Sequence, residues 1–167
     1  HISSDIFEEF ECIIFHMTDL PFGRGGSPLQ NLIVRGMENT KVTALKCVKA
    51  MDAGPIYLKT DLSLLGTAEE IYIRASKIVE NMILEILSKA LYPKPQTGEI
   101  TLFERRKPKD GNLELTENLG QIFDMIRMMD AKGYPLAFLE NDKFRLEFSR
   151  ASFKGDYIDA DVKIRIK

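Results

Sequence analysis

The sequence has no tryptophan and only two cysteines and two histidines among its 167 residues. Cys12 and Cys47 each lie within an apolar run, which argues against a secreted disulfide scaffold and favours a reducing, cytoplasmic compartment. No apolar run reaches the ~18–20 residues of a membrane-spanning helix and no signal peptide opens the chain, so we expect no membrane association. A single histidine beyond the first residue, without clustered cysteines, also argues against a metal site.

A strong excess of charge is absent as well. The net charge of −2 argues against a protein whose whole surface binds nucleic acid. Hydrophobic residues make up 44% of the chain and charged residues 29%, which is typical of a folded domain. The length allows one domain, or one domain with a small appendage.

The first half of the chain alternates predicted strands and helices. Strands are expected over 11–16, 41–48 and 56–64, and helices over 29–35 and 68–90. The first strand is apolar enough to be fully buried, and a loop rich in Pro and Gly follows it. Ser27 and Pro28 indicate the start of the shorter helix, and Thr67 with Glu70 forms a capping-box pair for the longer one. The longer helix has an apolar face made of Ile71, Ala75, Ile78, Met82, Ile86 and Leu87.

The second half is predicted to be rich in β-structure. Residues 93–98 contain two prolines and are expected to form a linker between residues 1–92 and residues 99–167. Beyond it we expect a strand over 100–103, a helix over 119–131, half-buried antiparallel strands over 144–148 and 158–166, and a hairpin turn at 140–142. The last two strands could close this region or pair between subunits, so a homodimer is one expectation.

Two residues stand where chemistry could occur. His16 ends the first strand, and Asp52 lies in the turn after the second strand. In open α/β sheets, ligands bind outside the carboxyl ends of strands, so these side chains could meet as a base and the carboxylate that orients it. The alternative is that His16 is a structural residue and Asp52 merely a turn residue. No Ser or Cys stands in a nucleophile-elbow context, which disfavours covalent acyl transfer.

One longer pattern favours the catalytic interpretation. Residues 16–30 read His-Met-Thr-Asp-Leu-Pro-Phe-Gly-Arg-Gly-Gly-Ser-Pro-Leu-Gln, and a second block comprises Thr40, Val42, Thr43, Asp52, Gly54 and Ile56. Together these blocks resemble the folate-dependent formyltransferase family, and the separation of His16 from Asp52 fits its register without a gap. The stretch from Ile126 to Phe138 resembles, less specifically, the start of the family's small C-terminal domain.

The resemblance implies an α/β protein with a Rossmann-like formyltransferase domain followed by a small β-rich C-terminal domain. Because only residues 1–11 precede the first strand, we expect the N-terminal part of the catalytic domain to be missing. The implied reaction transfers a formyl group from N10-formyltetrahydrofolate to a primary amine, on methionyl-tRNA or on a nucleotide-linked amino sugar.

The resemblance also implies roles for individual residues. His16 and Asp52 would be catalytic, and Ala50, Met51 and Asp52 would border the folate. The loop Arg24-Gly25-Gly26 would border the acceptor amine, although its glycines could equally form a flexible connector. For a tRNA acceptor, Arg105-Arg106-Lys107 is the local basic cluster that could contact phosphates.

One position departs from the family pattern. The family places an Asn two residues before the histidine, whereas this chain has Ile14, which cannot donate a hydrogen bond to an oxyanion. Asn31, nearby in sequence, is one candidate for a substitute donor. The alternatives to an active transferase are a relative that binds folate or acceptor without efficient catalysis, and a hydrolase that releases formate.

Overall fold

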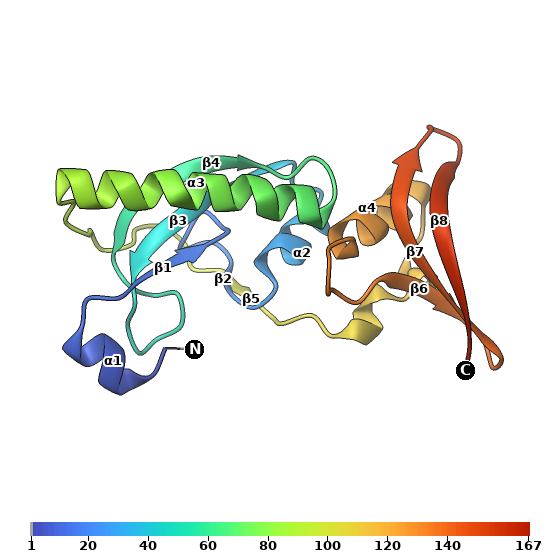
Figure 1. Cartoon of the computed structure of the whole chain (residues 1–167), viewed down its shortest axis with the longest axis horizontal. Helices are drawn as coiled ribbons and strands as arrows, with labels where there is room; N and C mark the ends of the chain where they lie inside the picture. The colour runs from blue at the N-terminus through green and yellow to red at the C-terminus, as the bar shows by residue number, and fades with distance from the viewer. Residues whose placement is uncertain (1) are drawn as a thin grey trace.

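The computed structural model describes residues 2–167 as an elongated molecule with a mixed α/β region at one end and a β-rich region at the other (Figure 1). Its helices are α1 (Ser4–Glu9), α2 (Pro28–Ile33), α3 (Ala68–Lys89) and α4 (Leu119–Met129), with short 3₁₀ turns η1 (Pro108–Gly111) and η2 (Leu113–Leu115). Its strands are β1 (Ile13–His16), β2 (Arg24–Gly25), β3 (Asn39–Lys46), β4 (Ile56–Ser63), β5 (Leu102–Phe103), β6 (Ala137–Glu140), β7 (Phe144–Phe153) and β8 (Ile158–Ile166). Within residues 2–167, no helix is both long and apolar enough to cross a membrane.

The first sheet has the order β1-β3-β4, with both neighbouring pairs antiparallel. His16 therefore pairs with Thr43 in the middle of β3, while Ile13 pairs with Lys46 at its end. The expectation that His16 and Asp52 meet at the carboxyl ends of neighbouring strands is wrong in this respect, because antiparallel neighbours end at opposite edges. A different element must bring Asp52 to His16.

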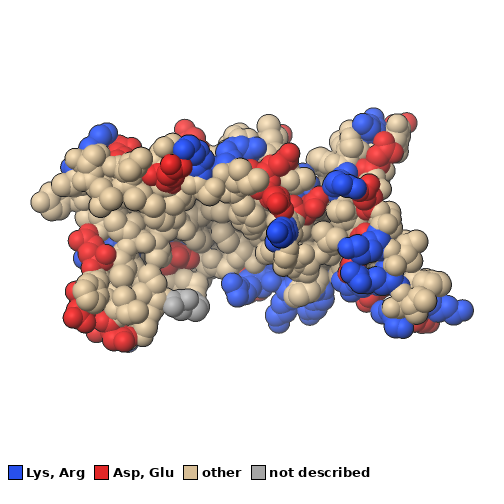
Figure 2. All heavy atoms as spheres, viewed as in Figure 1, with Lys and Arg blue, Asp and Glu red and all other residues tan. Residues whose placement is uncertain are grey.

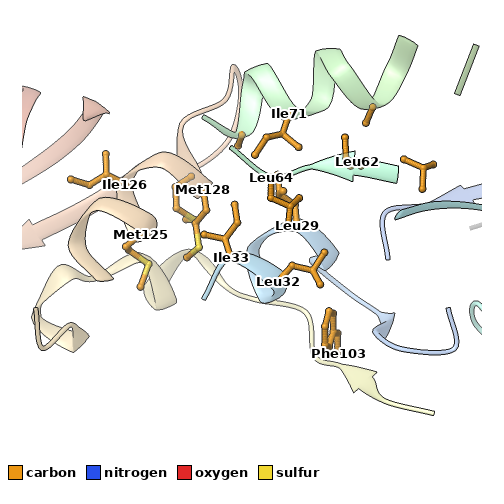
Figure 3. Packing of buried hydrophobic residues seen from close by; sticks show 14 of the residues in the cluster. Leu29, Leu32, Ile33, Leu62, Leu64, Ile71, Phe103, Met125, Ile126 and Met128 are labelled. Carbon is orange, nitrogen blue, oxygen red and sulfur yellow. The ribbon is translucent and has the colours of Figure 1, made fainter. Parts of the chain in front are cut away.

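Helix α3 covers this sheet and supplies its core. Thr67 accepts a hydrogen bond from the Glu70 amide and the Glu70 carboxylate accepts one from the Thr67 amide, so the predicted capping box is present. The apolar face of α3 packs with α2, β3, β4 and α4 in one cluster (Figure 3). The expectation that Leu87 lies on this face is wrong: it is 74% exposed while Ile86 is 6% exposed, because consecutive residues are rotated by about 100° around a helix.

Two local predictions in the first region need correction. The strand ending at His16 is not fully buried: only His16 is buried, and the preceding residues are half-buried, because β1 pairs on one side alone. Ser27 is the N-cap of α2 with Pro28 after it, as predicted, but its φ of 49° is left-handed and its hydroxyl does not cap the helix. That hydroxyl instead accepts a hydrogen bond from the Arg106 amide.

The segment between α3 and β5 returns to the first region. Lys94 forms an antiparallel bridge with Ile56 at the start of β4, with N···O distances of 2.7 and 2.8 Å. β5 then pairs in parallel with β2. Residues 92–103 therefore lie against the loops that follow β1 and β3.

The second sheet has the order β6-β7-β8, with α4 packed against β7. The hairpin turn predicted at 140–142 joins β6 to β7, although β6 itself was not predicted. The expectation that residues 158–166 are half-buried holds only at the start of the strand, where Ile158 and Ala160 are half-buried. Towards its end it is wrong: Ile164 is 67% exposed and Ile166 84% exposed, and β8 pairs only with β7 within the described residues.

Candidate active site

His16 has both ring nitrogens facing protein groups. Its Nε2 lies 2.8 Å from the Gly23 carbonyl oxygen, and because a carbonyl can only accept, Nε2 carries the hydrogen. Nδ1 then faces the Asp52 carboxylate, with 3.7 Å between Nδ1 and Oδ2. The histidine is buried at the end of β1, so its ring orientation is fixed by these two neighbours.

Asp52 reaches His16 through the loop that joins β3 to β4, rather than from a strand end. Its backbone has a φ of 52°, a left-handed conformation that aspartate tolerates better than most residues. The carboxylate Oδ2 accepts a hydrogen bond of 2.9 Å from the Gly25 amide. Gly54 lets this loop close, since a Cβ there would lie 1.8 Å from the Lys46 carbonyl oxygen.

The two glycines of the predicted acceptor loop lie tightly against β5. Gly25 has a φ of 115°, and a Cβ on it would lie 2.2 Å from the Phe103 carbonyl oxygen. A Cβ on Gly26 would lie 2.6 Å from the Arg105 Cβ. These positions are therefore a close packing contact rather than a flexible connector, because any larger residue would have to push the β2 and β5 backbones apart.

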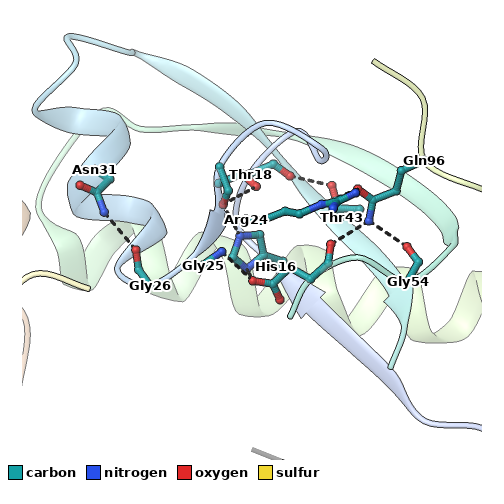
Figure 4. A network of polar contacts seen from close by, with 11 residues as sticks. His16, Thr18, Arg24, Gly25, Gly26, Asn31, Thr43, Gly54 and Gln96 are labelled. Carbon is teal, nitrogen blue, oxygen red and sulfur yellow. Dashed lines mark hydrogen bonds and ion pairs between the residues drawn. The ribbon is translucent and has the colours of Figure 1, made fainter. Parts of the chain in front are cut away.

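Arg24 and Gln96 form the remaining part of the polar network (Figure 4). Arg24 donates from Nε and Nη2 to Gln96 Oε1, at 3.1 and 2.7 Å. Gln96 Nε2 donates to the carbonyl oxygens of Asp52 and Gly54, each at 2.8 Å. Sequence reasoning missed Gln96, because a glutamine beside two prolines carries no signal that separates it from an ordinary linker residue.

Ile14, the residue at the position where the resemblance places an asparagine, has an apolar side chain that donates no hydrogen bond. Ile14 lines the same cavity as His16, two residues away on β1. Asn31 does not replace the missing amide, and the suggestion that it could is wrong. Its Nδ2 donates to the carbonyl oxygens of Gly26 at 3.0 Å and Glu104 at 2.8 Å, which uses both of its hydrogens.

A cavity of about 880 Å³ opens beside His16 and Asp52. Its walls combine apolar side chains with these polar groups, two glycines and two cations: Ile2, Phe7, Ile14, Cys47, Val48, Met51, Phe103, Gly25, Gly26, Lys49 and Arg105. Of the predicted folate-binding residues, Met51 and Asp52 line the cavity, whereas Ala50 lies in the same turn without lining it. Arg24 also stays outside the lining and points to Gln96 instead.

A second cavity of about 690 Å³ shares Arg105 with the first. The predicted basic cluster, Arg105-Arg106-Lys107, forms one side of it. Tyr72 also lines this cavity, and burial raises the pKa of its hydroxyl, which accepts a hydrogen bond from Gln30. Figure 2 shows one group of Lys and Arg side chains at the lower middle and right of the molecule and others along its upper side, whereas acidic side chains gather at the lower left, where α1 lies.

Known proteins resemble this chain in both halves. The family model for the methionyl-tRNA formyltransferase C-terminal domain matches residues 108–165. A solved methionyl-tRNA formyltransferase from Clostridium thermocellum is 55% identical with a TM-score of 0.97, over 100% of this chain and 74% of that one. A curated methionyl-tRNA formyltransferase from Thermodesulfovibrio yellowstonii is 30% identical over 141 residues, which are 81% of this chain and 46% of the relative. The chain thus spans about half the length of that relative.

A more distant structure shares the fold alone. HypX from Aquifex aeolicus, solved in complex with tetrahydrofolic acid, is 15% identical with a TM-score of 0.70, over 89% of this chain and 27% of that one. The high identity to the Clostridium thermocellum protein carries the family assignment, and the fold of the more distant relative agrees with it. The chain belongs to the formyltransferase family that includes methionyl-tRNA formyltransferase.

Proposed function

We propose that this chain is part of a folate-dependent N-formyltransferase that transfers a formyl group from N10-formyltetrahydrofolate to the amino group of methionyl-tRNA. The observation that carries the proposal is the meeting of His16 and Asp52, 3.7 Å apart, in a cavity with apolar walls. The names of the two methionyl-tRNA formyltransferase relatives support methionyl-tRNA as the acceptor.

The proposed domain organisation follows the same assignment. Residues 1–92 would belong to a Rossmann-like catalytic domain, residues 93–98 would connect the domains, and residues 99–167 would form the small β-rich C-terminal domain. The family match over 108–165 lies inside the last of these ranges and supports a C-terminal domain there, whereas β5, at residues 102–103, pairs with β2 and so lies with the first region.

The described cavity fits a pterin ring in its chemistry. Apolar side chains of Ile14, Val48 and Met51 offer surfaces for a flat heteroaromatic ring, and the Asp52 carboxylate offers an acceptor for ring N–H groups. We propose that Ala50, Met51 and Asp52 hold this end of the folate. The bound co-substrate supplies the formyl carbon that the amine attacks, and a distant relative solved with tetrahydrofolic acid supports this choice.

We assign to His16, together with Asp52, the role of accepting a proton from the attacking amine. Since Nε2 already donates to Gly23, the free electron pair of a neutral His16 lies on Nδ1, which faces Asp52. A proton taken up at Nδ1 is stabilised by the carboxylate, whose own position is fixed by the Gly25 amide. A primary amine next to Nδ1 and Oδ2 can therefore lose its proton to His16 as the new C–N bond forms. That proton can then be given to N10 of the folate as the bond between N10 and the formyl carbon breaks.

The acceptor is proposed to approach across the loop Arg24-Gly25-Gly26. Arg105 borders both cavities and lies beside Arg106 and Lys107, so phosphate groups of an acceptor can be bound close to the reacting amine. This basic side agrees with a tRNA acceptor, and equally with the diphosphate of a nucleotide-linked amino sugar. Parallel assays with the two acceptors distinguish them.

The test is a formylation assay on the full-length protein with N10-formyltetrahydrofolate and methionyl-tRNA. We expect turnover with methionyl-tRNA, and a decrease in kcat on the order of 10²-fold or more for His16→Ala and for Asp52→Asn. Absence of turnover with any primary amine would contradict the transferase and leave folate binding without catalysis. Formate release at the same rate without acceptor would indicate a hydrolase instead.

Ile14 provides a sharper version of this test. If the missing amide limits the rate, Ile14→Asn should raise kcat, by at most about 10²- to 10³-fold, because one oxyanion donor is typically worth that much. The matched control is Ile13→Asn, which makes the same change on the opposite face of β1. An equal effect of both changes would show that the result has nothing to do with the cavity.

A further inference from the structure

We infer that Gln96 is a positioning residue of the proposed active site, which holds the Asp52 loop against Arg24 and so keeps the Asp52 carboxylate in place beside His16. This inference rests on the proposed function, because it assigns Gln96 a role in that same site. Gln96 comes from the segment between α3 and β5, which is 44 residues from Asp52 and 72 residues from Arg24 in the sequence.

The amide of Gln96 has all its hydrogen-bonding capacity engaged. Its oxygen accepts twice from the Arg24 guanidinium, and its nitrogen donates to the Asp52 and Gly54 carbonyl oxygens. A guanidinium can only donate and a carbonyl can only accept, so the amide has one permitted orientation. Only glutamine and asparagine carry a carboxamide, which combines an accepting oxygen with a nitrogen that donates twice. Asparagine is one methylene shorter than glutamine.

The backbone on either side of Gln96 is tied to the site. Lys94 exchanges two hydrogen bonds with Ile56, directly after the Asp52 loop. The Thr101 carbonyl oxygen accepts hydrogen bonds from the amides of Gly23 and Arg24, both at 3.0 Å. The segment thus crosses between the two loops with both ends anchored, and Gln96 is half-buried while Pro95 and Thr97 beside it are exposed.

Gln96 fixes the position of Asp52 through a hydrogen bond to the Asp52 backbone, rather than through a contact with its carboxylate. The Asp52 carbonyl is held by Gln96, and the Asp52 carboxylate is held by the amide of Gly25, the residue after Arg24. Arg24 has no carboxylate within 4.0 Å among residues 2–167, so Gln96 is its principal side-chain partner there. Loss of the Gln96 contacts would therefore let the Asp52 loop move relative to both His16 and Gly25.

The substitution Gln96→Glu distinguishes the contact with Arg24 from the contact with the Asp52 loop. A carboxylate would still accept from Arg24, now as an ion pair, but it would repel the carbonyl oxygens of Asp52 and Gly54. Arg24→Gln makes the opposite change, because it removes the guanidinium and leaves the two donors to the loop. The matched control is Gln121→Glu at the start of α4, far from the cavity, where a glutamate suits the first turn of a helix.

The experiment measures kcat and KM of the full-length enzyme at 25 °C, together with Tm. For Gln96→Glu we expect kcat to fall on the order of 10- to 100-fold, with a change in its pH profile and a nearly unchanged KM for the acceptor. Arg24→Gln should lower kcat less, and Gln121→Glu should leave both constants unchanged. A Gln96→Glu enzyme with the kcat and pH profile of the wild type would overturn the inference, and so would a decrease in Tm without any change in kcat.

A second readout keeps the inference testable if the proposed reaction itself fails. In the full-length protein, the ring Cε1–H signal of His16 is assigned by NMR as the histidine signal that is lost in His16→Ala. At a fixed pH, Gln96→Glu should shift this signal because Asp52 moves relative to the ring, whereas Gln121→Glu should not. An unchanged His16 signal would overturn the positioning role even in a protein that shows no turnover.

Discussion

The two sheets of this protein differ in what covers them. In β3 and β4, alternate apolar residues are buried beneath α3, and Val42, Ala44 and Leu62 are at most 1% exposed. In β8 the alternation is as regular, yet Val162 is 47% exposed and Ile166 84% exposed. Alternation therefore establishes only that a strand has two unlike faces. Whether the apolar face is buried depends on a separate element that packs against it.

The largest expected change in the free energy of unfolding comes from truncating a buried side chain in the first sheet. Leu62→Ala should lower the free energy of unfolding by about 2–5 kcal/mol, because it leaves a cavity between β4 and α3. The measurement is denaturant unfolding followed by circular dichroism. Ile73→Ala on the exposed side of α3 is the control, and an equal loss in both variants would show that β4 is not covered as described.

The second prediction compares the hairpin loops of the two sheets. Gly54→Ala should cost about 1–3 kcal/mol, because its Cβ would overlap the Lys46 carbonyl oxygen and push the Asp52 loop outward. Gly155→Ala, between β7 and β8, meets nothing within 4 Å, and only its φ of 98° opposes the change, so it should cost about 1 kcal/mol or less. Formylation activity should fall only in the Gly54 variant. Equal formylation activities of the Gly54→Ala and Gly155→Ala variants would show that Gly54 is not needed for the geometry of the site.

The third prediction concerns the start of the helix that covers the first sheet. Thr67→Ala removes the acceptor for the Glu70 amide and should lower the free energy of unfolding by about 1 kcal/mol. The same unfolding measurement applies. Ser76→Ala within α3 makes a similar change without removing a cap, and it should cost less than Thr67→Ala.

The fourth prediction concerns the open sheet. Ile164→Ala should change the free energy of unfolding by no more than about 0.5 kcal/mol, since the side chain is already 67% exposed. A loss as large as that of Leu62→Ala, measured under identical conditions, would indicate that another surface covers β8 in solution. Unfolding at two protein concentrations would then tell whether that surface belongs to a second copy.

The smallest expected effect is a pH dependence at the α3 capping box. The hydrogen bond from the Thr67 amide lowers the pKa of the Glu70 carboxyl below its ordinary value of 4.5. A lowered pKa in the folded state means that the ionised group stabilises the fold above the unfolded pKa, and that this contribution is lost as the pH falls through the folded pKa. The stability difference between wild type and Glu70→Gln should thus be fully present above the ordinary pKa of 4.5 and decrease as the pH falls below it. Glu80→Gln, in the middle of α3, is the control.

Much of the local structure could be predicted because its causes are local. The capping box of α3 and the proline at the start of α2 lie in short segments whose conformational preferences depend on neighbouring residues. The family resemblance of residues 16–30 rests on the same kind of short-range information. The burial of β1 and β8 could not be predicted, because it depends on partners far away in sequence.

The candidate site also contains residues that could be predicted from the sequence and one residue that could not. His16 and Asp52 stood out from their type and their place in the chain, but the expected reason for their contact was wrong, since the sheet is antiparallel and a loop carries Asp52 back. Gln96 gave no signal at all. Its partners are 44 and 72 residues away, and only folding brings its amide to them.

The scarcity of cysteine, histidine and strong net charge argued against a disulfide scaffold and a basic platform. Short patterns predicted α2, α3 and α4, the turn between β6 and β7, and the candidate pair His16 and Asp52, but not α1. Tertiary structure decided which apolar faces are buried, how Asp52 reaches His16, and that Gln96 joins their loops. The physical reason is the separation in sequence between the residues that interact. Helix caps and turns depend on bonds between near neighbours, whereas burial and multi-loop hydrogen bonding depend on contacts that exist only after the chain has folded.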